Sequence, residues 1–354
     1  MSTLATLLAN RIRAGGPITI ADYMADCLMH PRYGYYATRD PFGAAGDFTT
    51  APEISQMFGE LLGLCLAQTW LSQNSPAPFA LAELGPGRGT LMADALRATR
   101  AVPGFHAALS LHLVETSATL RQRQKTTLVG FAPTWHDSTA TLPQAPLFAL
   151  ANEFFDALPI RQFQRAPQGW RERVVGLEGD ILTLGLADRT RPAFLAHRQA
   201  DTAPGEVVEI CPLLPGIIAD LAGRIAAHGG AALILDYGDW RSCGDTFQAL
   251  RSHARADPFA EPGLADLTAH VDFEAIARAA HPAHCSRMIA QGALLERLGI
   301  ALRARTLAQS LTGQALILHS DAYRRLTHPA EMGNLFKAVA LYPPHARPPP
   351  GFDA

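Results

Sequence analysis

The sequence predicts a doubly wound α/β fold, in which helices cover both faces of a mostly parallel sheet. From residue 79 onward, short and continuous apolar runs alternate with segments of helical spacing, a rhythm typical of parallel strands that are buried on both faces. A glycine-rich segment directly follows the first of these runs, where doubly wound folds bind their ligands. With 354 residues, of which 48% are hydrophobic, the chain can bury a large core.

Four apolar runs are the predicted parallel strands, and helical spacing predicts helices between them. The strands are expected at residues 79–84, 109–115, 147–151 and 231–237. The helices are expected at residues 90–100, 117–128 and 213–227. Ser117 is the type of residue that caps a helix start, so it supports the second helix.

Several segments lie outside this rhythm. The first residues predict a helix that carries Leu4, Leu7, Leu8 and Ile12 on one face. Alternating residues around Gly-rich turns predict an antiparallel hairpin insertion near residues 160–212. The Pro-rich end is expected to be a loose tail, because proline interrupts helices and strands. The expected division of the chain is an N-terminal segment (1–75), a catalytic domain (76–342) and the tail (343–354).

Charge and cysteine content argue against several classes of protein. Thirty Lys and Arg residues against 32 Asp and Glu residues leave no basic excess of the kind that nucleic-acid-binding proteins show. The five cysteines form no Cys-x-x-Cys pair, which favours a reducing compartment. No apolar run is long enough to span a membrane, and the N-terminus looks like an ordinary helix rather than a transit peptide. We therefore expect a cytoplasmic protein with no membrane insertion, no nucleic-acid partner and no metal.

The glycine-rich segment lies between a predicted strand and a predicted helix. Glycines there permit a tight turn and let the backbone approach a ligand closely. A dinucleotide-binding loop needs Gly-x-Gly-x-x-Gly, but the last position of that pattern, counted from Gly85, is occupied by Thr90. The observed glycines are Gly85, Gly87 and Gly89, with Glu83 upstream. This spacing is typical of methyltransferases, so it predicts S-adenosylmethionine rather than NAD as the cofactor.

Acidic side chains around this loop are candidates to hold the cofactor. Glu83 is expected beside the methionine part, whose sulfonium and ammonium groups favour a nearby carboxylate. Glu115 ends the next strand and is placed to accept both ribose hydroxyls. Asp137 follows the third strand position, where it could accept a hydrogen bond from the adenine amino group. Alternatively, Asp137 or Ser138 only caps a helix.

A group of polar and aromatic residues follows the third apolar run, at the expected carboxyl edge of the sheet. The acids Glu153 and Asp156, together with Phe154 and Phe155, suit a planar and positively charged acceptor. A guanidinium keeps its proton at neutral pH. Carboxylates can accept hydrogen bonds from its N–H groups and hold one nitrogen in line with the methyl group of the cofactor. Asn152 precedes these acids and is a further candidate on the cofactor side. Either acid could instead cap a turn, although one acid suffices for that.

A second polar cluster follows the fourth apolar run. Asp266 and His270 lie in this segment and are further catalytic candidates. His270 could relay a proton after transfer, or it could be a hydrogen-bonded packing residue. Asp272 is expected to be the N-cap of a helix over residues 273–280.

These residues together resemble the MidA family, which includes the mitochondrial complex I assembly-factor type of arginine methyltransferase. The resembling stretches cover nearly the whole chain and lie at residues 30–36, 46–56, 58–60, 83–90, 152–159, 236–238, 266–273 and 332–333. The resemblance implies a class I S-adenosylmethionine-dependent methyltransferase with a Rossmann-like, seven-stranded sheet. It also implies an N-terminal extension packed on the cofactor site, and insertions that include an acceptor-side loop near residues 238–272.

The resemblance also implies a substrate. For the mitochondrial member the reaction is symmetric dimethylation of an arginine on a peripheral-arm subunit of respiratory complex I, so a protein partner is expected here. Gly46, Asp47 and Thr49 would approach the cofactor from the N-terminal side. The chain departs from the family at Thr50, where serine is commoner. The short N-terminus suggests a bacterial member. Lysine or amide N-methylation remains an alternative, as does a scaffold that binds the cofactor without catalysis.

Overall fold

The computed structural model describes residues 3–38, 49–251 and 253–354, which group into two compact units. The sheet unit consists of Thr49–Phe155, Pro215–Gly238 and Phe273–Ala354. The hairpin unit consists of Asp156–Leu214, Asp239–Asp272 and the described residues that precede Thr49. Both expected insertions therefore fall in the hairpin unit, together with the first part of the N-terminal segment.

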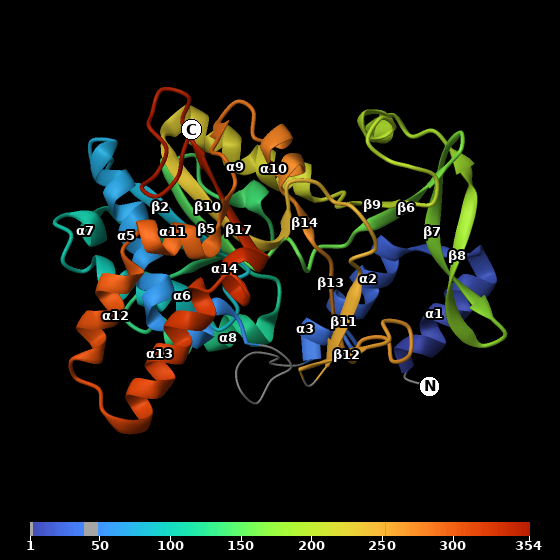
Figure 1. Cartoon of the computed structure of the whole chain (residues 1–354), viewed down its shortest axis with the longest axis horizontal. Coiled ribbons are helices and arrows are strands. Elements are labelled where there is room, and N and C mark those ends of the chain that lie inside the picture. The colour runs from blue at the N-terminus through green and yellow to red at the C-terminus, as the bar shows by residue number, and fades with distance from the viewer. Residues whose placement is uncertain (1–2, 39–48, 252) are drawn as a thin grey trace. The chain divides into compact units, whose positions relative to one another are not determined.

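The sheet unit contains the predicted parallel sheet. Its strands are β2 (Phe79–Leu84), β3 (Leu109–Val114), β4 (Thr134–His136), β5 (Leu147–Asn152), β10 (Gly230–Asp239), β15 (His284–Cys285), β16 (Ile289–Ala290) and β17 (Phe336–Tyr342). The main path of the sheet runs β15-β17-β10-β5-β2-β3-β4, and β16 also pairs with β17 (Figure 1). The strands from β10 to β4 pair in parallel, whereas β17 is antiparallel to β10. The seven strands of this path, in a sheet of nine strands among the described residues, confirm the α/β prediction and the implied seven-strand arrangement.

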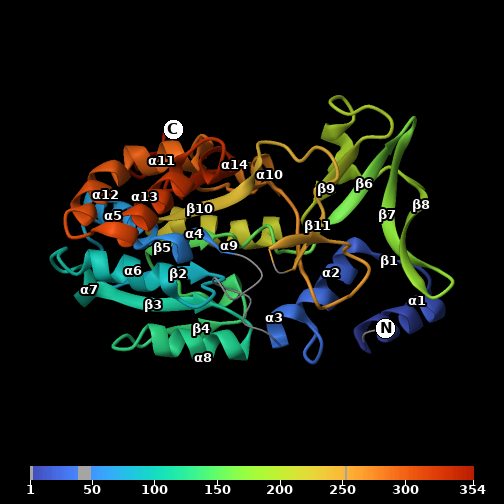
Figure 2. The same ribbon diagram turned by 60° about the horizontal axis from the view of Figure 1, so that its bottom comes forward.

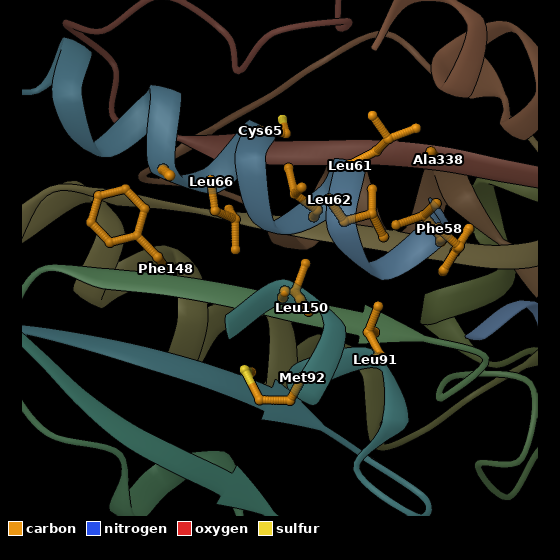
Figure 3. Packing of buried hydrophobic residues seen from close by; sticks show 14 of the residues in the cluster. Phe58, Leu61, Leu62, Cys65, Leu66, Leu91, Met92, Phe148, Leu150 and Ala338 are labelled. Atoms are coloured by element: carbon orange, nitrogen blue, oxygen red, sulfur yellow. The ribbon is translucent and has the colours of Figure 1, made fainter. Parts of the chain in front are cut away.

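The helices predicted between the strands are confirmed as α6 (Thr90–Thr99), α8 (Ala118–Thr127) and α9 (Leu214–His228). The unit also contains α4 (Ala51–Ile54) and α5 (Gln56–Ser72) before β2, α7 (Phe105–Ala108), α10 (Phe273–Ala279) and a 3-10 turn at Thr139–Thr141. Ser117 caps α8, because its side chain accepts the Leu120 N–H. Helix α5 is apolar on almost every side, and most of its residues are therefore buried. Figure 3 shows its side chains, Phe58 and Leu66 among them, in one cluster with Phe148 of β5.

The C-terminal part of the sheet unit adds four helices that were not predicted from the sequence (Figure 2). They are α11 (Gln291–Arg297), α12 (Ile300–Ala308), α13 (Gly313–Thr327) and α14 (Met332–Leu335). The Pro-rich end differs from the expected loose tail. Phe352 is buried in the core cluster, and the Arg287 N–H donates to the carbonyl of Asp353 (3.0 Å). A buried aromatic side chain and several hydrogen bonds thus anchor a segment that forms neither helix nor strand.

The hairpin unit is built on an antiparallel sheet in the order β1-β7-β6-β9, with β8 on the far side of β7. Its elements are α1 (Thr3–Gly15), β1 (Ile18–Thr19), α2 (Ile20–Met29), α3 (Tyr35–Thr38), β6 (Arg161–Ala166), β7 (Gly169–Glu178), β8 (Ile181–Thr190), a 3-10 helix (Ala193–Arg198) and β9 (Val207–Ile210). The alternation noted near residues 160–212 corresponds to these strands. Leu4, Leu8 and Ile12 are buried, but Leu7 is 45% exposed and does not share their face as expected.

A small second sheet completes the hairpin unit. It has the order β12-β11-β13 and consists of β11 (Gln248–Arg251), β12 (Ala254–Ala256) and β13 (Asp266–Thr268). The short β14 (Val271–Asp272) follows in the chain and is not a strand of this sheet. Ala249 and Leu267 of this sheet belong to the same buried apolar cluster as Tyr23 and Met24 of α2. No helix in the described part of the chain is long and apolar enough to cross a membrane.

Candidate cofactor and acceptor sites

The glycine-rich loop joins β2 to α6 with a backbone that favours glycine at three positions. Gly85, Gly87 and Gly89 have φ values of +61°, +51° and +84°, in the left-handed region that other residues rarely adopt. A Cβ atom on Gly85 would also lie 2.8 Å from the Phe154 ring. The turn therefore needs glycine for its conformation and, at Gly85, for space as well.

Two buried acceptors lie at the ends of neighbouring strands beside this loop. Glu83 is on β2 and Asn152 is on β5, and these strands pair in parallel. Glu83 Oε2 and Asn152 Oδ1 have no hydrogen-bond donor among the described residues. Burial raises the pKa of Glu83 to about 8, although a hydrogen bond from the Met92 N–H opposes the shift. Leaving a buried acceptor without a donor costs about 1–3 kcal/mol, so this position fits a ligand that brings donors and positive charge.

Glu115 directly follows β3, and its carboxylate is held by neighbours within the sheet unit. Its Oε1 accepts the Ser117 N–H (2.8 Å), and its Oε2 accepts the Gln124 Nε2 (3.3 Å). Burial raises the pKa of Glu115, while the hydrogen bonds from Ser117 and Gln124 oppose that shift. Each carboxylate oxygen has more than one lone pair, so these bonds leave capacity for the two ribose hydroxyls of the expected cofactor.

The remaining candidates for cofactor binding are less buried than Glu83 and Glu115 or lie outside the described residues. The Asp137 side chain is 84% exposed and forms an ion pair with Arg121 (2.5 Å), so its contact with an adenine remains a prediction. Thr49 is half-buried and lies shortly before α4. Gly46 and Asp47 lie outside the described residues, as does most of the loop that contains them.

Glu153 occupies a strained position at the end of β5. Its φ is +50°, a conformation that costs a residue other than glycine about 1–3 kcal/mol and that clusters at functional sites. Its main-chain N–H donates to the carbonyl of Leu235 (2.9 Å). Its Oε1 accepts both the Ala51 N–H (3.1 Å) and the Asn152 Nδ2 (3.1 Å). The carboxylate is therefore held in one orientation beside the start of α4.

Two acids outside the predicted set hold the same edge together. Glu53 of α4 accepts a hydrogen bond from Thr90 Oγ1 (2.6 Å), at the first residue after the glycine loop. Asp236 of β10 is fully buried, and its Oδ2 accepts the N–H groups of Phe154 (3.2 Å) and Phe155 (2.9 Å). Both residues lie within stretches that resemble the MidA family. That resemblance was the only sequence signal that could have singled them out.

The other acceptor-side candidates belong to the hairpin unit. Tyr36 Oη donates to Asp266 Oδ1 (2.8 Å), and the Asp156 carbonyl accepts the Ala269 N–H (3.0 Å). Burial, and then the charges of Asp266 and Asp156, raise the pKa of Tyr36 well above its usual range. The structure thus brings Asp156 and Asp266 to one tyrosine.

His270 and Asp272 are both held by serine or threonine. The His270 main-chain N–H donates to Thr246 Oγ1 (2.8 Å), and this main-chain contact does not decide between a proton relay and packing for the ring. The Asp272 carboxylate accepts the Ser242 N–H (2.9 Å), and its role as the N-cap of α10 stays a prediction. A catalytic role for His270 stays a prediction.

Comparison with known proteins gives this arrangement a context. Residues 61–290 match the model of a family described as S-adenosyl-L-methionine-dependent methyltransferases. The chain is 38% identical to the human mitochondrial protein arginine methyltransferase NDUFAF7, over 95% of this chain and 82% of that protein. It is 37% identical to the Drosophila melanogaster homologue, over 96% of this chain and 85% of that protein.

Solved structures agree with these sequence matches. A crystal structure from Burkholderia thailandensis, bound to S-adenosyl-homocysteine, superposes with a TM-score of 0.80 at 29% identity. The match covers 99% of this chain and 92% of that chain. The comparisons confirm the cofactor prediction, because the structural neighbour holds the demethylated form of S-adenosylmethionine.

Proposed function

Since the chain belongs to this family of S-adenosyl-L-methionine-dependent methyltransferases, we propose that it methylates an arginine side chain of a partner protein. The relatives that are 37–38% identical over almost the whole chain are named protein arginine methyltransferases. The structural observation that carries the proposal is the strained and firmly oriented Glu153 at the carboxyl edge of the sheet. A carboxylate in that place suits a cationic acceptor better than a neutral one.

The cofactor-side residues would bind the methyl donor in a fixed orientation. Glu83, Asn152 and the loop glycines would hold the methionine part, and Glu115 would hold the ribose. S-adenosylmethionine supplies an electrophilic methyl group when it is bound. Binding both reactants in one geometry lowers the entropic part of the barrier.

The acceptor-side acids would hold the guanidinium. Glu153 would accept hydrogen bonds from its nitrogens and favour the charge that builds on the guanidinium as the new carbon–nitrogen bond forms. Asp156 follows closely in the sequence and is the second acid of the proposal. Asp266 and His270 are the proposed route by which the proton lost from the methylated nitrogen reaches solvent.

The Glu153→Gln variant tests the acceptor. An amide oxygen can still accept the Ala51 N–H, so α4 should stay attached, but the negative charge is lost. We expect turnover to fall by about tenfold or more while the affinity for S-adenosyl-homocysteine changes by less than about threefold, because the lost interaction is made to the acceptor and its transition state. Glu178→Gln, at the exposed end of β7, is the matched control. Unchanged turnover in the Glu153 variant would contradict the proposal.

The partner is proposed to be a peripheral-arm subunit of respiratory complex I, dimethylated symmetrically. Mass spectrometry of complex I subunits from the native host, with and without this protein, tests both points. Loss of a symmetric dimethylarginine from one subunit is the expected result. Unchanged arginines, together with methyl groups missing from lysine or glutamine, would redirect the proposal to the lysine or amide alternative.

A scaffold that binds the cofactor without essential catalysis is the second candidate. It is favoured only by the attachment of α4 to the residue after the cofactor loop through Glu53 and to the end of β5 through Glu153. A Glu153→Ala, Asp156→Ala double variant separates the two functions. Full rescue of complex I assembly without methyl transfer would support the scaffold, and failed rescue by a folded variant supports the enzyme.

A further inference from the structure

Gln124 is a buried polar residue on a mostly polar and exposed helix. It lies in the second half of α8 and is completely inaccessible to solvent, whereas its neighbours Arg123 and Lys125 are exposed. Burying an amide in this way costs free energy unless every donor and acceptor is satisfied. Its partners therefore indicate what the residue is for.

Three hydrogen bonds of the Gln124 side chain run to neighbouring parallel strands or to the segments that follow them. Nε2 donates to the Gly87 carbonyl (2.8 Å), in the loop after β2. The same nitrogen donates to Glu115 Oε2 (3.3 Å), directly after β3. Oε1 accepts the indole N–H of Trp135 (2.8 Å), on β4. One amide thus ties together three adjacent strands near their carboxyl ends.

The orientation of this amide is fixed by chemistry. The indole nitrogen of Trp135 can only donate, so the oxygen of the amide must face it. The nitrogen then faces the Gly87 carbonyl and the Glu115 carboxylate, which can both only accept when the carboxylate is ionised. A flipped amide would place acceptor against acceptor at Gly87 and Glu115, and donor against donor at Trp135.

We propose that Gln124 is a positioning residue that sets the carboxylate of Glu115 at a fixed place relative to the glycine loop, and thereby determines selectivity for the two ribose hydroxyls of the cofactor. The proposal rests on the proposed cofactor contacts of Glu115 and Gly87. Binding of both ribose hydroxyls depends on the position of the Glu115 carboxylate. A carboxylate that accepts two vicinal hydroxyls must lie in their plane and at hydrogen-bond distance from both. Without the amide, Oε2 of the carboxylate loses this donor, and the Ser117 N–H holds only the other oxygen.

The test compares two ligands that differ only at the ribose. Calorimetry measures the affinities for S-adenosyl-homocysteine and for its 2′,3′-dideoxy analogue. We expect the protein to prefer the hydroxylated ligand by about tenfold to a hundredfold, which is the range for hydrogen bonds to a charged group. In Gln124→Leu this preference should fall roughly fivefold or more, while the affinity for the dideoxy analogue changes much less. A merely structural role would weaken both ligands alike.

A matched control and a second variant keep the test decisive. Gln122→Leu makes the same substitution at an exposed position of the same helix, and it should leave the preference unchanged. Gln124→Glu keeps the size and the acceptor for Trp135, but an ionised carboxylate cannot donate to Glu115. Its ribose preference should be weak at neutral pH and should recover as the pH falls, because the protonated carboxyl can donate its single proton to Glu115.

The outcomes separate this inference from the function on which it rests. If Glu115→Ala reduces the ribose preference and both Gln124 variants keep it, the positioning role is wrong and the cofactor contacts stand. If neither Glu115→Ala nor the Gln124 variants change the preference, the ribose contact itself is wrong. If Gln124→Leu is unfolded by circular dichroism, the pH dependence of Gln124→Glu decides, and a preference that is independent of pH overturns the proposal.

Discussion

At the scale of single residues, the cofactor loop is governed by backbone conformation. Gly87 has a positive φ, and its carbonyl is held by Gln124. A branched side chain at this position is strained and would stand where the ligand is expected. We predict that Gly87→Val prevents measurable binding of S-adenosyl-homocysteine, and that Glu115→Ala weakens it by about 1.5–3 kcal/mol, the worth of a hydrogen bond to a charged group. Calorimetry measures both.

Backbone strain and steric blocking can be told apart with a glycine elsewhere. Gly179 has φ +62° in the turn between β7 and β8, and a Cβ atom there would meet nothing within 4 Å. Gly179→Val therefore carries the same kind of strain outside the site, and it should lower stability without changing affinity. Normal affinity in both Gly87→Val and Glu115→Ala would contradict the assignment of the loop.

The buried carboxyl group of Glu83 leads to a prediction about proton release when the cofactor binds. Burial raises its pKa to about 8, so the free protein holds this proton at pH 7, whereas a cationic ligand beside it would favour the ionised form. Binding of S-adenosylmethionine at pH 7 should therefore release up to about one proton. The release appears as a dependence of the calorimetric enthalpy on the ionisation enthalpy of the buffer. An equal release by Glu83→Gln would contradict this origin.

The same shift affects stability in the absence of ligand. The folded state keeps the Glu83 proton over a pH range in which the unfolded chain, with the ordinary value of 4.5, has lost it. The resulting contribution to the free energy of unfolding is fully present below pH 4.5 and is lost as the pH rises through about 8. Glu83→Gln should flatten this part of the pH profile in urea titrations.

At the scale of elements, α5 and α6 approach each other through glycines. A Cβ atom on Gly63 would lie 2.6 Å from the Cα of Ala95, and one on Gly59 would lie 2.7 Å from the Cβ of Asp94. Since the Ala95 backbone cannot move independently of its helix, α5 would have to shift. We predict that Gly63→Ala destabilises the protein by about 1–3 kcal/mol, the usual cost of overpacking, as measured by urea unfolding.

The control for this prediction is a glycine in another helix. Gly223 lies within α9, and a Cβ atom there would meet nothing within 4 Å. Gly223→Ala should instead stabilise the protein by about 0.5–1 kcal/mol, because alanine has the higher helix propensity. If Gly63→Ala were as stable as Gly223→Ala, the two helices would not be held at the distance seen here.

The contrast between predicted and unpredicted elements has a physical basis. The parallel strands β2, β5 and β10 were predicted from the sequence because burial on both faces makes them almost continuously apolar. β3 is apolar and buried mainly in its second half, which was enough to predict it. The two-residue strands β15 and β16 have no such signature, since their pairing depends on β17. Motif spacing likewise singled out the loop glycines and Glu115 as candidates, because their pattern is local in the sequence. It missed Gln124, Glu53 and Asp236, because only contacts distant along the chain give these side chains their role.

At the scale of the whole molecule, the hairpin unit is assembled from separate segments of the chain. The chain leaves the sheet unit after Phe155 and again after Gly238, which follow or lie near the carboxyl ends of β5 and β10. Ligand sites of doubly wound folds lie at this edge. Insertions at these two points leave the order of the parallel strands unchanged.

Ligand-linked stability provides the final prediction, since it depends on the whole folded protein. A ligand that binds only the native state raises the free energy of unfolding by about 2.7 kcal/mol at a concentration one hundred times its Kd. We expect S-adenosylmethionine and S-adenosyl-homocysteine each to raise the Tm by a few degrees, and NAD to leave it unchanged, because the glycine spacing at Gly85, Gly87 and Gly89 does not match a dinucleotide loop. Thermal unfolding with each ligand measures the shifts, and Gly87→Val, which should lose the shift with both methyltransferase ligands, is the control. A shift with NAD alone would refute the cofactor assignment, because binding energy appears in the Tm whatever the acceptor is.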